Sequence, residues 1–148
     1  MNTIWILVMN QAEAQIYSAR RLPGSLDPVG TLVNTEGAAH ARDLVSDAPG
    51  RVHDRMGAAR HVLEPDTGVK EEGLRRFARE VAGYLKAANL RGDFDQLVLL
   101  AAPATLGVIR KTLTGKLSQS VIKVISKDVV GQGLDKIRVQ LDRSFELK

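Results

Sequence analysis

A short, uninterrupted apolar run near the start of the chain limits the folds that are open to it. Residues 3–9 read TIWILVM, with large apolar or β-branched side chains at nearly every position. This run is far too short to span a membrane and suits a strand that is buried on both faces. A second run, FDQLVLLAA at residues 94–102, is typical of a buried parallel strand. Two such strands need helices on both faces of their sheet.

The segments after the first run predict a small meander. Residues 14–19 alternate small or apolar side chains with polar ones, which is typical of a strand with one face buried and the other more exposed to solvent. Residues 29–35 supply a third strand, after a turn that is marked by proline and glycine. Because the connections are short, we expect neighbouring strands to pair in an antiparallel arrangement.

The clearest helix is expected over residues 69–89. Its apolar side chains recur at spacings of three and four residues, which places them on one face. They are Leu74, Phe77, Ala78, Val81, Leu85 and Ala88. The opposite face carries Arg75, Arg76, Arg79 and Lys86. This basic face is either a solvated surface or a contact for a polyanion, and both interpretations stay open.

The rest of the chain continues with alternating strands and helices. After the strand at 94–102 we expect a helix over residues 104–113, which residues 116–119 extend by a turn. A strand over residues 121–126 follows, and the spacing of Leu134, Ile137 and Leu141 indicates a final helix.

The expected order of elements is therefore β-β-β-α-β-α-β-α. Three meandering strands and two right-handed crossovers build a five-stranded mixed sheet with the first strand in its middle. We expect a single α/β domain of mixed α+β character over residues 1–148. This is the arrangement of ribonuclease H-like domains and of related components of the translation machinery.

Composition places the chain among globular proteins. It is 44% hydrophobic and 26% charged, which is too apolar for a disordered protein. The sequence has no cysteine, which excludes disulfides and thiolate metal sites. No secretory signal or membrane-spanning run is evident, so we expect a cytoplasmic protein without a membrane span.

Charge is distributed unevenly along the chain. The formal net charge is +4, and residues 110–148 hold nine basic and four acidic side chains. A basic C-terminal third favours anionic partners such as RNA. A surplus of this size is also common on an ordinary solvated surface, so charge alone does not decide between the two.

The stretch of residues 36–68 follows neither the helical nor the strand pattern, and we expect a long loop there. A loop of this length in a compact domain is usually functional or disordered. It holds all three histidines and several carboxylates, namely His40, Asp43, Asp47, His53, Asp54, His61, Glu64 and Asp66. Their spacing matches no metal motif such as HExxH, so we predict no metal site and no cofactor.

The sequence lacks the motifs of several common enzyme classes. A ribonuclease H-type nuclease needs carboxylates that converge on divalent metal ions at strand ends, and neither residues 3–9 nor residues 97–102 contain one. There is no Gly-rich phosphate motif, no Walker lysine and no GxSxG elbow. Nothing in the spacing fixes a triad around Ser46. We therefore predict no catalytic residue, and a binding protein is favoured over an enzyme.

Glycines and arginines of the long loop suggest a different use. Gly50 precedes Arg51, and Gly57 lies three residues before Arg60. Small residues let the chain approach a partner closely, while arginine offers planar, two-pronged contacts to phosphate. That chemistry suits an RNA backbone, and a flexible loop with solvated charges is the alternative interpretation.

Five strings of the sequence carry a family resemblance. They are ARDLVSDAPGR at 41–51, GAARHVLEP at 57–65, KEE at 70–72, RFARE at 76–80 and FDQLVL at 94–99. These strings are similar to the bacterial family of host attachment proteins, which are described as required for attachment to host cells. The resemblance runs nearly from end to end. It implies a role in attachment and supplies no mechanism.

The element order also resembles, more distantly, the middle domain of class I peptide-chain release factors of archaea and eukaryotes. There a glycine-rich GGQ loop comes just before a long helix that bears arginines, and MGAAR at residues 56–60 occupies the corresponding place. No glutamine lies in the loop of this chain. The resemblance therefore implies contact with the ribosome or tRNA rather than hydrolysis of peptidyl-tRNA.

Our first hypothesis is a non-enzymatic module that binds the ribosome, tRNA or other structured RNA. Its binding residues would be Arg42, Asp43, Asp47, Arg51, Arg55, Gly57, Arg60, His61, Glu64, Arg75, Arg76 and Arg79. A second hypothesis is a protein-interaction factor that acts in attachment to host cells. A third is a hydrolase that uses a histidine or aspartate of the loop. The sequence leaves the oligomeric state open.

Overall fold

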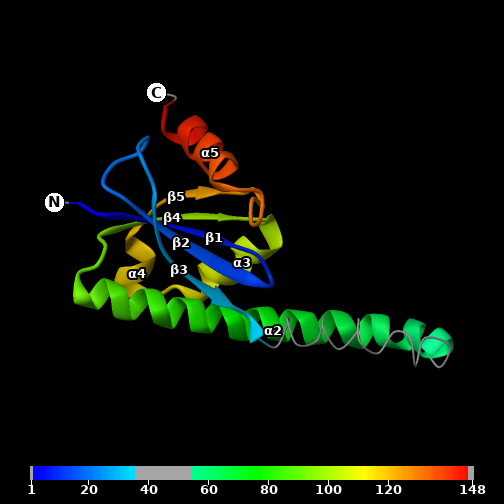
Figure 1. Ribbon diagram of the computed structural model, residues 1–148. Coiled ribbons are helices and arrows are strands. Elements are labelled where there is room, and N and C mark those ends of the chain that lie inside the picture. The colour runs from blue at the N-terminus through cyan, green and yellow to red at the C-terminus, as the bar shows by residue number, and fades with distance from the viewer. Residues whose placement is uncertain (1, 36–54, 147–148) are drawn as a thin grey trace.

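A five-stranded mixed sheet forms the centre of the structure (Figure 1). The computed structural model describes the backbone of residues 2–35 and 55–146, and the side chains of residues 2–35 and 71–145. The sheet order is β3-β2-β1-β4-β5. Its strands are β1 (Ile4–Met9), β2 (Glu13–Ala19), β3 (Asp27–Val33), β4 (Gln96–Ala101) and β5 (Val121–Ile125).

Strand β1 lies in the middle of the sheet, as its apolar sequence predicts. It pairs in an antiparallel arrangement with β2 and in a parallel arrangement with β4. All six of its residues are buried, and five of the six residues of β4 are buried as well. Both apolar runs are therefore strands that are covered on two faces, because neither face of either strand reaches water.

Helices cover the two faces of the sheet unequally (Figure 1). The long helix α2 (Arg55–Arg91), α3 (Pro103–Thr112) and α4 (Gly115–Gln119) lie on one face, and α5 (Leu134–Glu146) lies on the other. The connections from β3 to β4 and from β4 to β5 advance in the same direction along the sheet. Right-handed crossovers then place their helices on the same face, which brings α2 next to α3 and α4.

The apolar side of α2 builds the larger of two cores. Phe77, Val81 and Leu85 are at most 1% exposed and belong to the same cluster as Trp5 of β1. The ring of Trp5 stacks on that of Phe94, with centroids 4.7 Å apart. Aromatic pairs of this kind contribute about 0.5–1.5 kcal/mol beyond the area that they bury. Trp5 therefore joins the central strand to the segment that connects α2 with β4.

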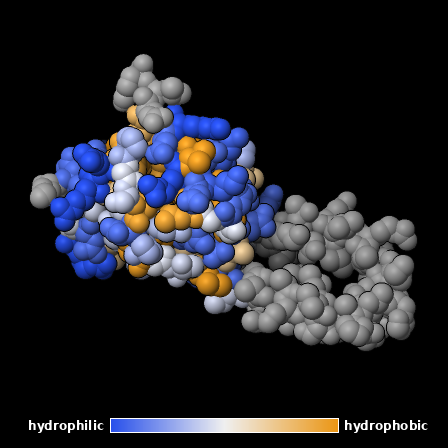
Figure 2. Space-filling model, turned by 45° about the horizontal axis from the view of Figure 1, so that its top comes forward, coloured by the Kyte–Doolittle hydropathy of each residue, from blue (hydrophilic) through white to orange (hydrophobic). Residues whose placement is uncertain are grey.

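The smaller core lies on the opposite face. It is formed by side chains of β1, β4 and α5 that are at most 1% exposed. They are Ile6, Val8, Val98, Ile137 and Leu141. On the outer surface shown in Figure 2, apolar side chains form small separate patches between hydrophilic ones. Together the two cores confirm the predicted five-stranded mixed sheet with helices on both faces.

One boundary differs clearly from the sequence prediction. We expected residues 36–68 to be a loop and the helix to begin at Val69, but α2 already begins at Arg55. The second half of the expected loop is thus helical, and residues 36–54 lie outside the described part of the chain. The turn of residues 116–119 is also a separate helix, α4, rather than an extension of α3.

Hydrophobic periodicity missed this part of α2 because it detects only helices that cover a core. The N-terminal part of α2 extends past the end of the sheet, so none of the described strands lies beneath it (Figure 1). Helix α2 also includes Pro65, although a proline inside a helix removes one backbone hydrogen bond. Because helix growth from an established helix is cooperative, the loss of one hydrogen bond at Pro65 does not end the helix.

Two leucines of α2 test this account of the core. We expect Leu85→Ala to lower the free energy of unfolding by about 2–5 kcal/mol, because it removes most of a fully buried side chain and leaves a cavity in the core. Leu90, on the same helix, is 72% exposed, and Leu90→Ala should change stability by less than about 0.5 kcal/mol. Urea denaturation of both variants measures the difference. Equal effects would show that α2 does not pack through this face.

Candidate nucleic-acid interface

Helix α2 has a buried face and a basic face, as the spacing of its residues predicts. Its six predicted apolar residues, from Leu74 to Ala88, are at most 5% exposed. The opposite face is open to solvent and carries Arg75, Arg76, Arg79 and Lys86. The predicted basic face of this helix is therefore confirmed as a surface, and its position relative to α3 and α4 decides what it can contact.

A groove runs between α2 and the helices α3 and α4. It consists of two adjoining cavities of about 490 and 560 Å³, which share Arg79 and Thr112. Cationic side chains from three helices line it, and we call it the basic groove. These residues are Arg75, Arg79 and Lys86 of α2, Lys111 of α3 and Lys116 of α4.

The cations of α2 lie along one stripe of the helix. Arg79 follows Arg75 by four residues, which is an axial rise of about 6 Å. Lys86 follows Arg79 by seven residues, which is a rise of about 10.5 Å. Both spacings are close to whole turns, so the three side chains lie on nearly the same side of the helix. Lys111 and Lys116 come from the other wall. A linear polyanion that follows the groove can therefore contact positive charge from both walls and along its length.

Small residues keep the groove open. Ala82 and Gly83 of α2 and Ala104 and Gly107 of α3 contribute to its surface. A Cβ atom added at Gly83 or at Gly107 would meet nothing within 4 Å, so packing inside the protein does not require glycine at either position. Glycine inside a helix costs about 0.5–1 kcal/mol relative to alanine. Its presence leaves room for close approach from outside.

Carboxylates of α2 neutralise only part of this charge. Guanidinium nitrogens of Arg75 lie 3.8 Å from a carboxylate oxygen of Glu71 and 3.3 Å from one of Glu72. A guanidinium nitrogen of Arg79 lies 3.9 Å from the other carboxylate oxygen of Glu72. These side chains are more than half exposed, and ion pairs of that kind contribute little to stability. Among the described side chains, no ion pair involves Lys86, Lys111 or Lys116. The groove thus retains positive charge that an anionic ligand can contact.

The structure brings together only some of the predicted site residues. Arg75, Arg76 and Arg79 share the basic face of α2, and Arg75 and Arg79 also line the groove. Four predicted residues lie outside the described part of the chain, namely Arg42, Asp43, Asp47 and Arg51. Five others belong to the N-terminal part of α2 rather than to a loop, and only their backbone is described; they are Arg55, Gly57, Arg60, His61 and Glu64.

Sequence reasoning missed the second wall of the groove. Lys111 and Lys116 lie about thirty residues after the basic face of α2 in the sequence, and α3 and α4 place them across the groove from it. Two signals were available: the basic surplus after residue 110, and the right-handed crossovers that put both helical segments on one face. Together the two signals place basic residues of the segment after β4 on the same face as α2.

The described residues include neither a membrane-spanning helix nor a cluster of metal-binding side chains. None of the described helices is long and apolar enough to cross a membrane. The described residues also contain no group of three or more histidine, cysteine or acidic side chains that could hold a metal ion. The side chains of all three histidines lie outside the described part of the chain, so the sequence prediction about them stays untested.

A family model described as "Protein required for attachment to host cells" matches residues 5–141. The chain belongs to this host attachment family. The match includes the whole of α2 and both walls of the basic groove. The sequence resemblance to the family is thereby confirmed.

Among curated proteins, an uncharacterised protein of Rickettsia prowazekii (strain Madrid E) is 31% identical to this host attachment family protein over 78 residues. The alignment covers 51% of this chain and 52% of the relative. The chain therefore spans about half the length of the curated relative that it matches.

Solved structures show a similar fold in a translation factor. The crystal structure of the archaeal translation termination factor aRF1 aligns with 99% of this chain and 35% of that protein, with a TM-score of 0.52 and 12% sequence identity. A second structure, described as an archaeal protein, covers 97% of this chain with a TM-score of 0.46 and 10% identity. At this level of identity, the likeness to aRF1 shows a shared fold. The host attachment family protein thus shares its fold with about a third of aRF1.

The groove glycines provide a test that is independent of any ligand. We expect Gly83→Ala to raise the free energy of unfolding by about 0.5–1 kcal/mol, because alanine favours the helix and its Cβ enters open space. Gly107→Ala should act in the same direction. Thermal and urea denaturation of both variants measure the effect. A loss of stability in both would mean that the groove surface is packed too tightly to admit a methyl group.

Proposed function

We propose that this host attachment family protein is a non-enzymatic cytoplasmic module that binds the phosphate backbone of RNA, in the ribosome or in a structured RNA such as tRNA. The proposal rests on one observation above all. Three helices converge to line a single groove with five cationic side chains. Each cation alone has an ordinary explanation as a solvated surface charge, whereas their convergence on one concave surface favours a linear anion.

The chemistry of the groove matches an RNA backbone better than a small anion. The two cavities form an elongated site with positive charge on both walls, whereas one phosphate ion needs only a compact cluster. Arginine can bind phosphate in a planar, two-pronged geometry, and lysine adds mobile point charge. Contacts of this kind position a backbone without reading its sequence. We therefore expect weak sequence preference.

Two further observations support a partner in the translation apparatus. The fold resembles that of a protein described as an archaeal translation termination factor. The long helix α2, which bears the basic face, also extends beyond the sheet and increases the reach of the molecule (Figure 1). The sequence has no glutamine between Gln15 and Gln96, so the proposal does not include the ester hydrolysis that a GGQ loop assists.

Salt-dependent co-sedimentation with bacterial ribosomes tests this function. Because binding to phosphates releases counterions, the association constant should fall linearly with salt on a log–log scale. In Lys111→Gln/Lys116→Gln, the slope should become shallower by about 0.7 to 0.9 for each phosphate that the variant no longer neutralises. The matched control is Arg138→Gln/Arg143→Gln, which removes two exposed arginines from α5 on the opposite face. An absence of co-sedimentation at low salt would reject the proposed function.

The family description supports a second candidate function. A protein required for attachment to host cells could act as a protein-interaction factor, and the family match is the observation that favours it. Cell fractionation separates the two candidates. Recovery with ribosomes in the cytoplasm favours RNA binding, whereas exclusive recovery outside the cytoplasm would contradict it and favour a direct role in attachment.

A further inference from the structure

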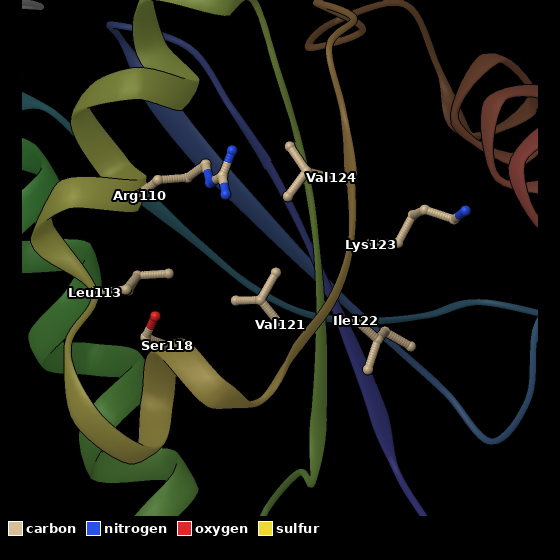
Figure 3. Close-up of a pocket in the computed structure, with 7 residues that line it drawn as sticks. All are labelled: Arg110, Leu113, Ser118, Val121, Ile122, Lys123 and Val124. Carbon is tan, nitrogen blue, oxygen red and sulfur yellow. The ribbon is translucent and has the colours of Figure 1, made fainter.

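A second concave site lies beside strand β5, and it shares no lining residue with the basic groove. This β5 pocket has a volume of about 320 Å³. Its wall on one side is formed by α3, by α4 and by the segment between them, and its wall on the other side is β5 itself (Figure 3). The lining residues are Arg110, Leu113, Ser118, Val121, Ile122, Lys123 and Val124.

The pocket adjoins a free strand edge. Strand β5 is the outermost strand on its side of the sheet, and it pairs only with β4 among the described residues. Its outer edge therefore offers backbone N–H and C=O groups to which another extended chain can bind. Outside the sheet ladder, one described backbone bond engages the strand, from the N–H of Lys127 to the C=O of Ile125 at 3.1 Å.

Four aliphatic side chains, Ser118 and two cationic side chains line the pocket (Figure 3). Val121 and Val124 point from β5 toward α3, and the guanidinium of Arg110 reaches from α3 toward β5. Lys123 points away, to the other face of the sheet, where its Nζ lies 5.5 Å from the ring centroid of Phe145. Arg110 is thus the cation that faces an occupant of this pocket.

Arg110 is exposed, and no ion pair within the described side chains involves it. A guanidinium group binds a carboxylate through two parallel, charge-assisted hydrogen bonds, which are among the stronger polar contacts in proteins. The pocket therefore complements a ligand that carries a carboxylate and an apolar group close to each other.

We propose that the edge of β5 binds an extended acidic segment of a partner protein, which adds a strand to the sheet and places a carboxylate on Arg110. In such strand addition, main-chain hydrogen bonds supply affinity, and pockets for alternate side chains supply specificity. Alternate residues of a strand point to the same face, so an apolar residue near the carboxylate could lie against Val121 and Val124. This surface is separate from the proposed RNA site.

The shape of the edge explains why the carboxylate is needed. Strand β5 has only five residues, and its register shifts between Leu97 and Val98 of β4, which places a bulge near Ile122. Short, bulged edge strands resist indiscriminate pairing. An incoming strand therefore gains few backbone bonds here, and the contact with Arg110 selects an acidic segment over other extended chains.

Peptide binding to the full chain tests the proposal. The probe is a set of fluorescein-labelled octapeptides of alternating valine and threonine, with a glutamate placed at each position in turn. We expect at least one member to bind saturably in fluorescence anisotropy and to shift the amide resonances of residues 121–125. The same peptide with lysine in place of glutamate, or with alternate backbone nitrogens methylated, should bind at least about tenfold more weakly.

Variants of the protein locate the contact. Arg110→Gln should weaken binding of the glutamate peptide at least about tenfold, whereas Arg110→Lys should lose less because it keeps the charge. Ser118→Tyr, at an exposed position, should obstruct the pocket without entering the core. Arg138→Gln on α5 is the matched control and should bind as the unchanged protein does, and circular dichroism verifies that each variant folds.

Several outcomes would overturn the proposal. These are no binding by any peptide of the set, equal binding of the glutamate and lysine peptides, or no effect of Arg110→Gln. Preferential binding of single-stranded RNA at Arg110 would also contradict it. Ribosome co-sedimentation does not depend on this site, so either proposal can fail while the other stands.

Discussion

The packing of α2 against β1 and β4 is the interaction on which the rest of the structure depends. Strands β1 and β4 are apolar on both faces, and without α2 the larger core would be open to water. Phe77, Val81 and Leu85 close that core, and Trp5 fixes the segment between α2 and β4 through its stack on Phe94. The same packing turns the basic side of α2 outward and sets it beside α3 and α4.

The basic groove follows from this packing together with the handedness of the crossovers. Two right-handed connections in the same direction bring α2, α3 and α4 onto one face, so that cations far apart in the sequence line one concave surface. Individually, the exposed ion pairs of Arg75 and Arg79 stabilise the fold little. Collectively, the cations produce a surface potential that attracts polyanions.

The sequence predicted those elements whose residues pack on the core. The two apolar runs and the periodic face from Leu74 to Ala88 identified the buried strands and the packed part of α2, because burial imposes those patterns. The N-terminal part of α2 was wrongly assigned to a loop, since it extends beyond the described strands, whose burial imposes the period on the rest of the helix. Lys111 and Lys116 were missed because tertiary packing, not local sequence, places them opposite α2.

Photo-crosslinking in living cells, followed by mass spectrometry of the crosslinked peptides, tests most directly whether the basic groove contacts RNA. The account predicts RNA adducts on both walls, at residues 75–90 of α2 and at Lys111 or Lys116 of α3 and α4. Because the groove and α5 lie on opposite faces of the sheet, peptides of α5 should carry few adducts. Adducts concentrated on α5, or no RNA adducts on either wall, would contradict the central claim.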